Sequence, residues 1–229
     1  MIWFVVPLLL LFLGGLWYWL FIITEGVYLG RRIVVWLYDL TAHKYDEIKQ
    51  YDEAAERFFV VRPLLFHLRH KPAPLILDVA TGTGRVPLYV LESPTFNGRV
   101  IGLDAAEKML ALAVAKLRSF GHRASFIQQT ADALPFPNNS FDAVTCLESL
   151  EFFPSETAAL QEMVRVLRPG GTLMITRRRG WEARTFIGRY HSRDQYAEYL
   201  ITLGLADVEI LPWQIDYDQV FASKSGNGR

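Results

Sequence analysis

The chain has 229 residues, and its 24 Lys and Arg balance its 24 Asp and Glu, so its formal net charge is zero. This balance provides no basic surface for nucleic acid, and a single cysteine excludes a disulfide framework and a cysteine-rich metal site. The five histidines show no metal-ligand spacing. We therefore predict neither a bound metal nor a nucleic-acid partner.

The first predicted element is an apolar helix, because residues 2–23 contain no charged side chain. A helix of this length spans about 33 Å, which is enough to cross the hydrocarbon core of a bilayer. Trp3 and Trp19 suit the two membrane interfaces. A cleaved signal peptide is less compatible, because Thr24-Glu25-Gly26 is a poor cleavage site. We predict a transmembrane anchor over residues 1–24.

The segment after the apolar run carries positive charge. Arg31, Arg32 and Lys44 follow the run, and no Lys or Arg precedes it. The positive-inside rule then predicts a single-pass protein of the cell membrane with a cytoplasmic catalytic domain. Residues 31–40 are too short to cross, and they form either a helix on the membrane surface or a lid on the domain. We assign residues 25–74 to a juxtamembrane and helical cap or lid segment.

The rest of the chain alternates between predicted helices and strands. A helical stretch at 44–70 ends at Lys71-Pro72-Ala73-Pro74. Helices are then expected near 85–92, 106–119, 156–167 and 192–203, and strands near 75–77, 99–103, 124–128, 141–146, 171–177, 206–213 and 216–223. This alternation predicts an α/β fold, a Rossmann-like doubly wound sheet of seven strands with an antiparallel last strand. It occupies residues 75–224, and residues 225–229 form a disordered tail.

A glycine-rich turn, Asp78-Val-Ala-Thr-Gly-Thr-Gly84, follows the first strand and precedes a helix. A phosphate-binding loop would need Lys after the last glycine, and this chain has Arg85. A dinucleotide fingerprint would need a small residue where Pro87 stands. S-adenosylmethionine has no phosphate, and it needs a carboxylate for its ribose at the end of the second strand. Asp104 occupies that place.

Four segments at family spacing carry a resemblance to a known family: 77–84, 101–110, 131–144 and 165–173. With these segments, most of residues 75–177 resembles class I S-adenosylmethionine-dependent methyltransferases, and the nearest subgroup is the ubiquinone/menaquinone-biosynthesis type. The resemblance implies a Rossmann-like fold, S-adenosylmethionine as cofactor and methyl transfer as the reaction.

The resemblance also implies roles for individual residues. The turn would surround the methionine part of the cofactor, Asp104 would hold the ribose, Met109 would pack on the adenine and Asp132 would accept from its amino group. The implied cofactor site comprises Asp78, Ala80, Thr81, Gly82, Gly84, Asp104, Ala105, Met109, Asp132, Ala133, Cys146 and Leu147. Purely structural roles compete with these, because Asp104 suits an N-cap and Cys146 a buried apolar position.

Methyl transfer to an acidic acceptor needs a general base. Glu148 and Glu151 follow the fourth predicted strand, and His191 lies before a late helix, so we predict these three as catalytic residues. Many relatives carry His where this chain has Glu151, so the acceptor specificity of those relatives does not transfer. The run 177–179 is three arginines, which suits either an anionic headgroup or a solvated surface.

The anchor and the resemblance together predict a membrane-bound methyltransferase with a small lipophilic acceptor, such as a quinone precursor, a lipid headgroup or a thiol. Two alternatives remain at this point. One is a scaffold that binds S-adenosylmethionine without turnover, and the other is a nicotinamide-dependent reductase. Sequence alone determines neither the methylated atom nor the oligomeric state.

Overall fold

The computed structural model describes residues 2–226, so most of the predicted tail at 225–229 lies outside the described residues. One mixed sheet has the strand order β3-β2-β1-β4-β5-β7-β6. Its strands are β1 (Leu75–Val79), β2 (Arg99–Asp104), β3 (Ala124–Gln128), β4 (Phe141–Cys146), β5 (Leu167–Arg178), β6 (Leu205–Pro212) and β7 (Tyr217–Lys224). Strands β1 to β5 pair in parallel, and β7 is antiparallel to β5 and β6. The predicted seven-stranded sheet with an antiparallel last strand is confirmed.

The helices of this domain are α6 (Arg85–Glu92), α7 (Glu107–Lys116), α8 (Glu156–Val166), the short α9 (Gly180–Ala183) and α10 (Arg193–Thr202). Two apolar clusters contact the sheet, and β4 takes part in both, with Val144 in one and Ala143 in the other. Every residue of β4 is consequently buried, as expected for a central parallel strand. The α7 helix ends earlier than predicted, because a 3₁₀ segment (Arg118–Arg123) with Gly121 at φ +56° follows it.

The N-terminal region consists of short helices. They are α1 (Ile2–Tyr18), the π-helix η1 (Trp19–Ile23), the 3₁₀ turns η2 (Val27–Leu29) and η3 (Ala42–Lys44), α2 (Arg31–Thr41), α3 (Tyr45–Lys49), α4 (Glu53–Glu56), the π-helix η4 (Arg57–Val61) and α5 (Arg62–His67). The helical stretch predicted at 44–70 is confirmed over 45–49 and 53–67, with one interruption between them. Gln50 takes a left-handed conformation at φ +45°, and Asp52 starts a new helix by accepting a hydrogen bond from the Ala55 amide at 2.8 Å.

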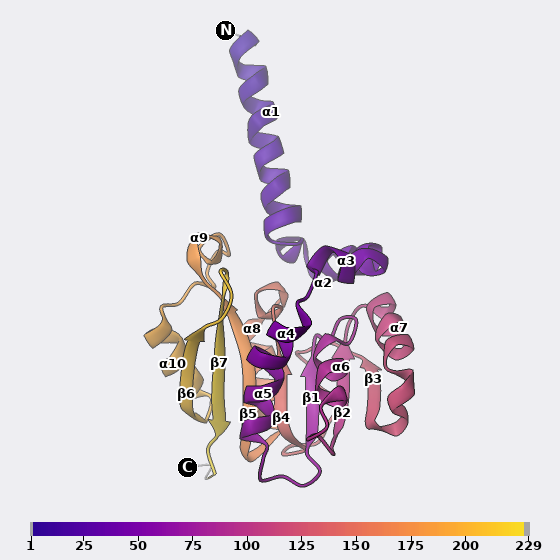
Figure 1. Ribbon diagram of the computed structural model, residues 1–229. Helices are drawn as coiled ribbons and strands as arrows, with labels where there is room; N and C mark the ends of the chain where they lie inside the picture. The colour runs from indigo at the N-terminus through magenta and orange to yellow at the C-terminus, as the bar shows by residue number, and fades with distance from the viewer. Residues whose placement is uncertain (1, 227–229) are drawn as a thin grey trace.

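The α1 helix projects away from the sheet, whereas α2 and α3 lie across the edge at which the parallel strands end (Figure 1). Residues Val5–Ile23 are apolar and long enough to cross a membrane, and none of this stretch is buried in the structure. The end of this run is fixed to the domain. The indole of Trp19 donates to the carbonyl of Thr185 at 3.2 Å and stacks on Tyr28.

Candidate cofactor and active site

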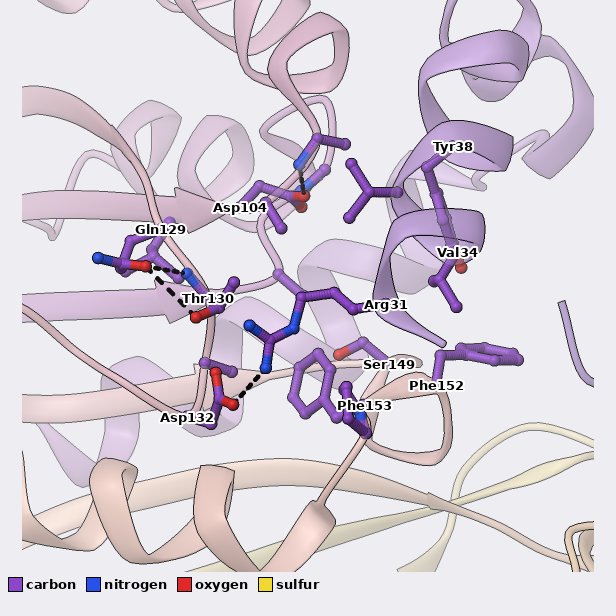
Figure 2. A pocket seen from close by; sticks show the side chains of 18 of the residues that line it. Arg31, Val34, Tyr38, Asp104, Gln129, Thr130, Asp132, Ser149, Phe152 and Phe153 are labelled. Atoms are coloured by element: carbon purple, nitrogen blue, oxygen red, sulfur yellow. Dashed lines mark hydrogen bonds and ion pairs between the residues drawn. The ribbon is translucent and has the colours of Figure 1, made fainter. Parts of the chain in front are cut away.

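The main pocket lies beyond the carboxyl ends of β1 to β4, where open α/β sheets bind their ligands. The empty space in the pocket is about 840 Å³, and this volume includes open solvent at the mouth. Loops from four strands form its floor and α2 forms its roof (Figure 2). Predicted cofactor residues that line it are Ala80, Gly82, Asp104, Ala105, Asp132 and Leu147.

The glycine-rich turn begins at Asp78, which is fully buried. Asp78 accepts hydrogen bonds from the hydroxyls of Thr81 at 2.7 Å and Thr145 at 2.6 Å. Burial raises the pKa of Asp78 to about 6, although these two hydroxyls oppose the shift. Asp78 and Thr81 line a small cavity that shares Ala80, Gly82 and Leu147 with the main pocket. The turn therefore forms an extension of the main pocket.

Gly84 ends the turn and precedes α6, and it lies outside both pocket linings. Its φ of +82° and its position explain why the residue is glycine. A Cβ atom there would lie 2.7 Å from Cδ1 of Leu117. The role of Gly84 in the structure is to let the turn pass close to the segment after α7.

Asp104 connects the first two strand ends. Its carboxylate accepts from the Gly82 amide at 2.8 Å and from the Ala106 amide at 2.9 Å. Burial raises the pKa of Asp104, and these backbone amides counteract the shift. Asp104 is not the N-cap of α7, because Ala106 occupies that position and the bond from its amide closes a turn before the helix. Because each carboxylate oxygen has two lone pairs, Asp104 can also accept from a ribose hydroxyl in the pocket.

Asp132 follows β3 and faces Arg31 of α2. The two side chains form an ion pair at the pocket, with Thr130 beside them (Figure 2). Burial alone would raise the pKa of Asp132, but hydrogen bonding with Thr130 and the charge of Arg31 hold it below its ordinary value. Asp132 is therefore ionised and available as an acceptor. Ala133, its predicted neighbour in the site, is outside the pocket lining, and its amide donates to the Thr130 carbonyl at 3.3 Å.

The α2 helix packs on the domain, as expected for a lid. Val34 and Tyr38 line the pocket, and Val34 shares an apolar cluster with Phe152 and Phe186. Asp39 accepts from the backbone amide of Lys108 at 2.9 Å, which attaches α2 to the start of α7. We call α2 the lid.

Glu148 is the predicted catalytic residue that the structure places in the pocket. It lies directly after β4 at φ +54°, and its carboxylate accepts from Arg85 at 2.8 Å and Lys49 at 3.2 Å. Glu56 also pairs with Arg85, at 3.3 Å. Burial favours the protonated form of Glu148, but Arg85 and Lys49 outweigh it and keep its pKa below the ordinary value.

Glu151 and His191 do not line the main pocket, contrary to our prediction. Both line a separate small cavity with Arg177, Arg178 and Tyr196. The reason is the 3₁₀ turn Leu150–Phe152 after β4, which brings Phe152 and Phe153 to the cofactor pocket and Glu151 to the other side. There Glu151 accepts from Tyr217 at 2.5 Å and from Arg178 at 3.2 Å, and burial raises its pKa.

Met109 and Cys146, like Gly84 and Ala133, are predicted contacts that lie outside the pocket lining. Met109 is fully buried in a cluster with Ala42 and Ala106, where it supports the lid from below instead of facing an adenine. Cys146 is also fully buried, and its Sγ lies 3.1 Å from the hydroxyl of Ser149. Burial raises the pKa of Cys146, so it remains a neutral thiol.

The sequence analysis did not predict several residues of the pocket lining. They are Val34, Val35, Tyr38, Tyr45, Gln129, Thr130, Ser149, Phe152, Phe153 and Arg31 as the partner of Asp132. The lid residues carry no local motif. Gln129 and Thr130 could have been predicted as lining residues, because they lie between the third strand and Asp132 and thus at the same edge of the sheet.

Comparison with known proteins shows which proteins this part of the chain resembles. A family model described as a methyltransferase domain matches residues 76–171. Demethylmenaquinone methyltransferase of Thermus thermophilus is 43% identical over 100 residues, covering 44% of this chain and 45% of that protein. The ubiquinone/menaquinone biosynthesis C-methyltransferase UbiE of Shewanella frigidimarina is 32% identical over 145 residues, covering 62% and 58%. This chain thus spans about half the length of these relatives.

The fold also matches solved structures. The crystal structure of the [4+2]-cyclase SpnF superposes with a TM-score of 0.68 at 20% identity, covering 85% of this chain and 96% of that chain. This likeness concerns the fold alone. The family match is more specific, because residues 76–171 hold all four strand ends around the pocket. Residues 76–171 thus match a methyltransferase domain, and over this part the chain is similar to ubiquinone/menaquinone-biosynthesis methyltransferases.

Proposed function

We propose that this protein is anchored in the membrane by α1 and methylates a lipophilic acceptor, of which a quinone precursor is the best candidate. The proposal is supported by the position of the lid, which forms the roof of the pocket. The lid that covers the cofactor loops begins at Arg31, and the exposed apolar run ends at Ile23. The pocket and the anchor are thus neighbours in space as well as in sequence.

The residues present fit S-adenosylmethionine. The pocket combines carboxylates at two strand ends, Asp104 and Asp132, with apolar lining from Leu103, Val34 and Phe153. We assign the ribose hydroxyls to Asp104, the adenine amino group to Asp132 and the methionine part to the turn around Gly82. The bound cofactor supplies an activated methyl group on a sulfonium. The chain positions the acceptor against that methyl group and excludes water under the lid.

Carbon methylation of a phenolic or quinol acceptor requires removal of a proton. Of the three predicted catalytic residues, Glu148 is the one that lines the pocket. Its carboxylate is ionised because of its two basic partners. We propose that Glu148 holds or accepts that proton, while Arg85 and Lys49 fix its orientation. Glu151 and His191 lie in the separate cavity, so we assign them no direct contact with the acceptor.

The quinone class is supported by the similarity to ubiquinone and menaquinone methyltransferases and by the proposed anchor. The lid lies outside the span that the family model matches. Arg31, Arg32 and Lys44 follow the apolar run, which orients the domain to the cytoplasm in the proposal.

The test uses the full chain reconstituted in lipid vesicles, methyl-labelled S-adenosylmethionine and a membrane lipid extract. We expect label in the organic phase, in a species that co-migrates with a methylated quinone. Label confined to water-soluble acceptors would refute the lipophilic acceptor. An Asp104→Asn variant should abolish incorporation, whereas Asp194→Asn, an exposed aspartate on α10, is the matched control that should retain it.

A further inference from the structure

Large apolar side chains are exposed around the point where α1 leaves the domain. Trp181 on α9 is 67% exposed, Ile187 in the following loop is 68% exposed and Ile215 in the β6–β7 turn is 88% exposed. Exposed apolar groups scattered over a surface need no explanation, but a group gathered at one place marks an interaction surface.

The topology brings these residues to one edge of the sheet. The α9 helix follows the carboxyl end of β5, and the β6–β7 turn lies at the same edge because β6 runs parallel to β5. Figure 1 shows α9 and the β6–β7 turn on the side from which α1 projects. The hydrogen bond from Trp19 to the Thr185 carbonyl attaches the base of α1 between Trp181 and Ile187.

The lid extends the same surface. Val34 and Tyr38 face the pocket, whereas Trp36 and Leu40 on the opposite side of the helix are exposed. Charged groups of both signs lie beside these apolar residues. Arg32 and Arg184 are exposed, as is Asp216 next to Ile215, whereas Glu182 next to Trp181 and Asp39 next to Leu40 are half-buried. We call Trp36, Leu40, Trp181, Ile187 and Ile215 together the docking face.

We propose that the docking face inserts into the headgroup boundary of the bilayer that α1 spans, which lays the lid on the membrane surface. The proposal rests on the anchor in the proposed function. A bilayer is the favoured partner because the docking face is continuous with the apolar surface of α1. Tryptophan, aliphatic side chains and arginine at the margin are also the composition that membrane interfaces prefer. A lipophilic acceptor then enters the pocket from the bilayer, beside the lid.

The test measures depth in the membrane at single positions. Cys146 is fully buried, so added cysteines can be labelled selectively. Full-length Ile187→Cys and Ile215→Cys variants carry a nitroxide and are placed in nanodiscs of phosphatidylethanolamine and phosphatidylglycerol. The matched control is Ile201→Cys, 57% exposed at the end of α10 and thus at the opposite edge of the sheet. Leu10→Cys, 64% exposed on α1, reports on the anchor.

Collision rates with oxygen, which concentrates in lipid, and with a water-soluble nickel chelate distinguish the outcomes. We expect oxygen to dominate at positions 10, 187 and 215, and nickel to dominate at 201. Nickel dominance at 187 and 215 with oxygen dominance at 10 would overturn the docking face and leave the anchor intact. Nickel dominance at 10 as well would overturn both. Protection of 187 and 215 from both reagents would mean that protein covers the face, which also refutes the proposal.

Discussion

Arg31 on the lid and Asp132 after β3 form an ion pair that joins the roof of the pocket to its floor. The two residues are separated by a hundred positions in the sequence, and Asp132 is the residue assigned to the adenine. A cofactor that reaches Asp132 would therefore compete with this pair, and we expect the pair to open on binding. Since the side chains are 41% and 29% exposed, solvent screens the pair and limits its contribution.

An Arg31→Ala variant should bind cofactor faster with little change in stability. An exposed pair contributes at most about 1 kcal/mol, so its loss should accelerate association of S-adenosylhomocysteine by up to about fivefold. Stopped-flow fluorescence measures the rate, and thermal unfolding checks stability. Arg32→Ala, the exposed neighbour, is the control. Equal association rates in all three proteins would show that the pair does not gate the pocket.

An Asp104→Asn variant should lose cofactor affinity by about tenfold or more, because hydrogen bonds to a charged group contribute about 1.5–3 kcal/mol. The substitution also removes an acceptor for one of the Gly82 and Ala106 amides, so we expect a fall of about 1 kcal/mol in the free energy of unfolding. Calorimetric titration with S-adenosylhomocysteine measures the affinity. An unchanged affinity would refute the ribose role.

A Glu148→Gln variant should be destabilised as well as impaired in catalysis. Its carboxylate and Arg85 are both buried, and removal of one partner of a buried pair costs about 3 kcal/mol. The ordinary pKa of Glu148 is 4.5, and its pKa in the folded chain is lower. The ionised side chain therefore stabilises the fold above pH 4.5, and this stabilisation is lost as the pH falls below that value. Urea unfolding measures the loss, with the exposed Glu198→Gln on α10 as control. Full stability with lost turnover would assign Glu148 a purely chemical role.

Asp78 should give the opposite dependence on pH. Its pKa is about 6 in the folded chain and 3.8 in the unfolded chain. The folded state therefore holds more protons between these values, and stability falls as pH rises through this window, by up to about 3 kcal/mol. In Asp78→Asn this contribution disappears. Urea unfolding at pH 4 to 7 measures the free energy of unfolding of both proteins. The value for the variant minus the value for the parent should rise with pH. A constant difference would contradict the raised pKa.

Much of the domain could be predicted from the sequence because its strands are encoded locally. The short apolar runs that became β3 and β4 were predicted at their observed bounds, 124–128 and 141–146. The residues at the strand ends followed from the topology, since parallel strands place their carboxyl ends at one edge. Asp104 and Asp132 are therefore found in the pocket as expected.

The misassigned residues depend on long-range contacts or on a single turn. Residues 31–40 have an amphipathic pattern that fits a membrane surface and a protein surface equally well. Contacts with Phe152 and Phe186, more than a hundred residues away, place the helix on the domain. Glu151 and Phe152 are adjacent, and only the 3₁₀ turn determines which of them reaches the pocket. Neither feature produces a periodic signal in the sequence.

The connection between Ile23 and Arg31 limits how far the catalytic domain can travel. Residues Thr24 to Gly30 form it, with Gly26 and Gly30 at positive φ. Seven residues reach at most about 25 Å when fully extended. Even with every contact to α1 broken, the lid cannot drift beyond that radius. With α1 in the bilayer and a lipophilic acceptor, as we propose, encounters with the acceptor become a search over two dimensions, whereas S-adenosylmethionine and its product exchange with the surrounding water.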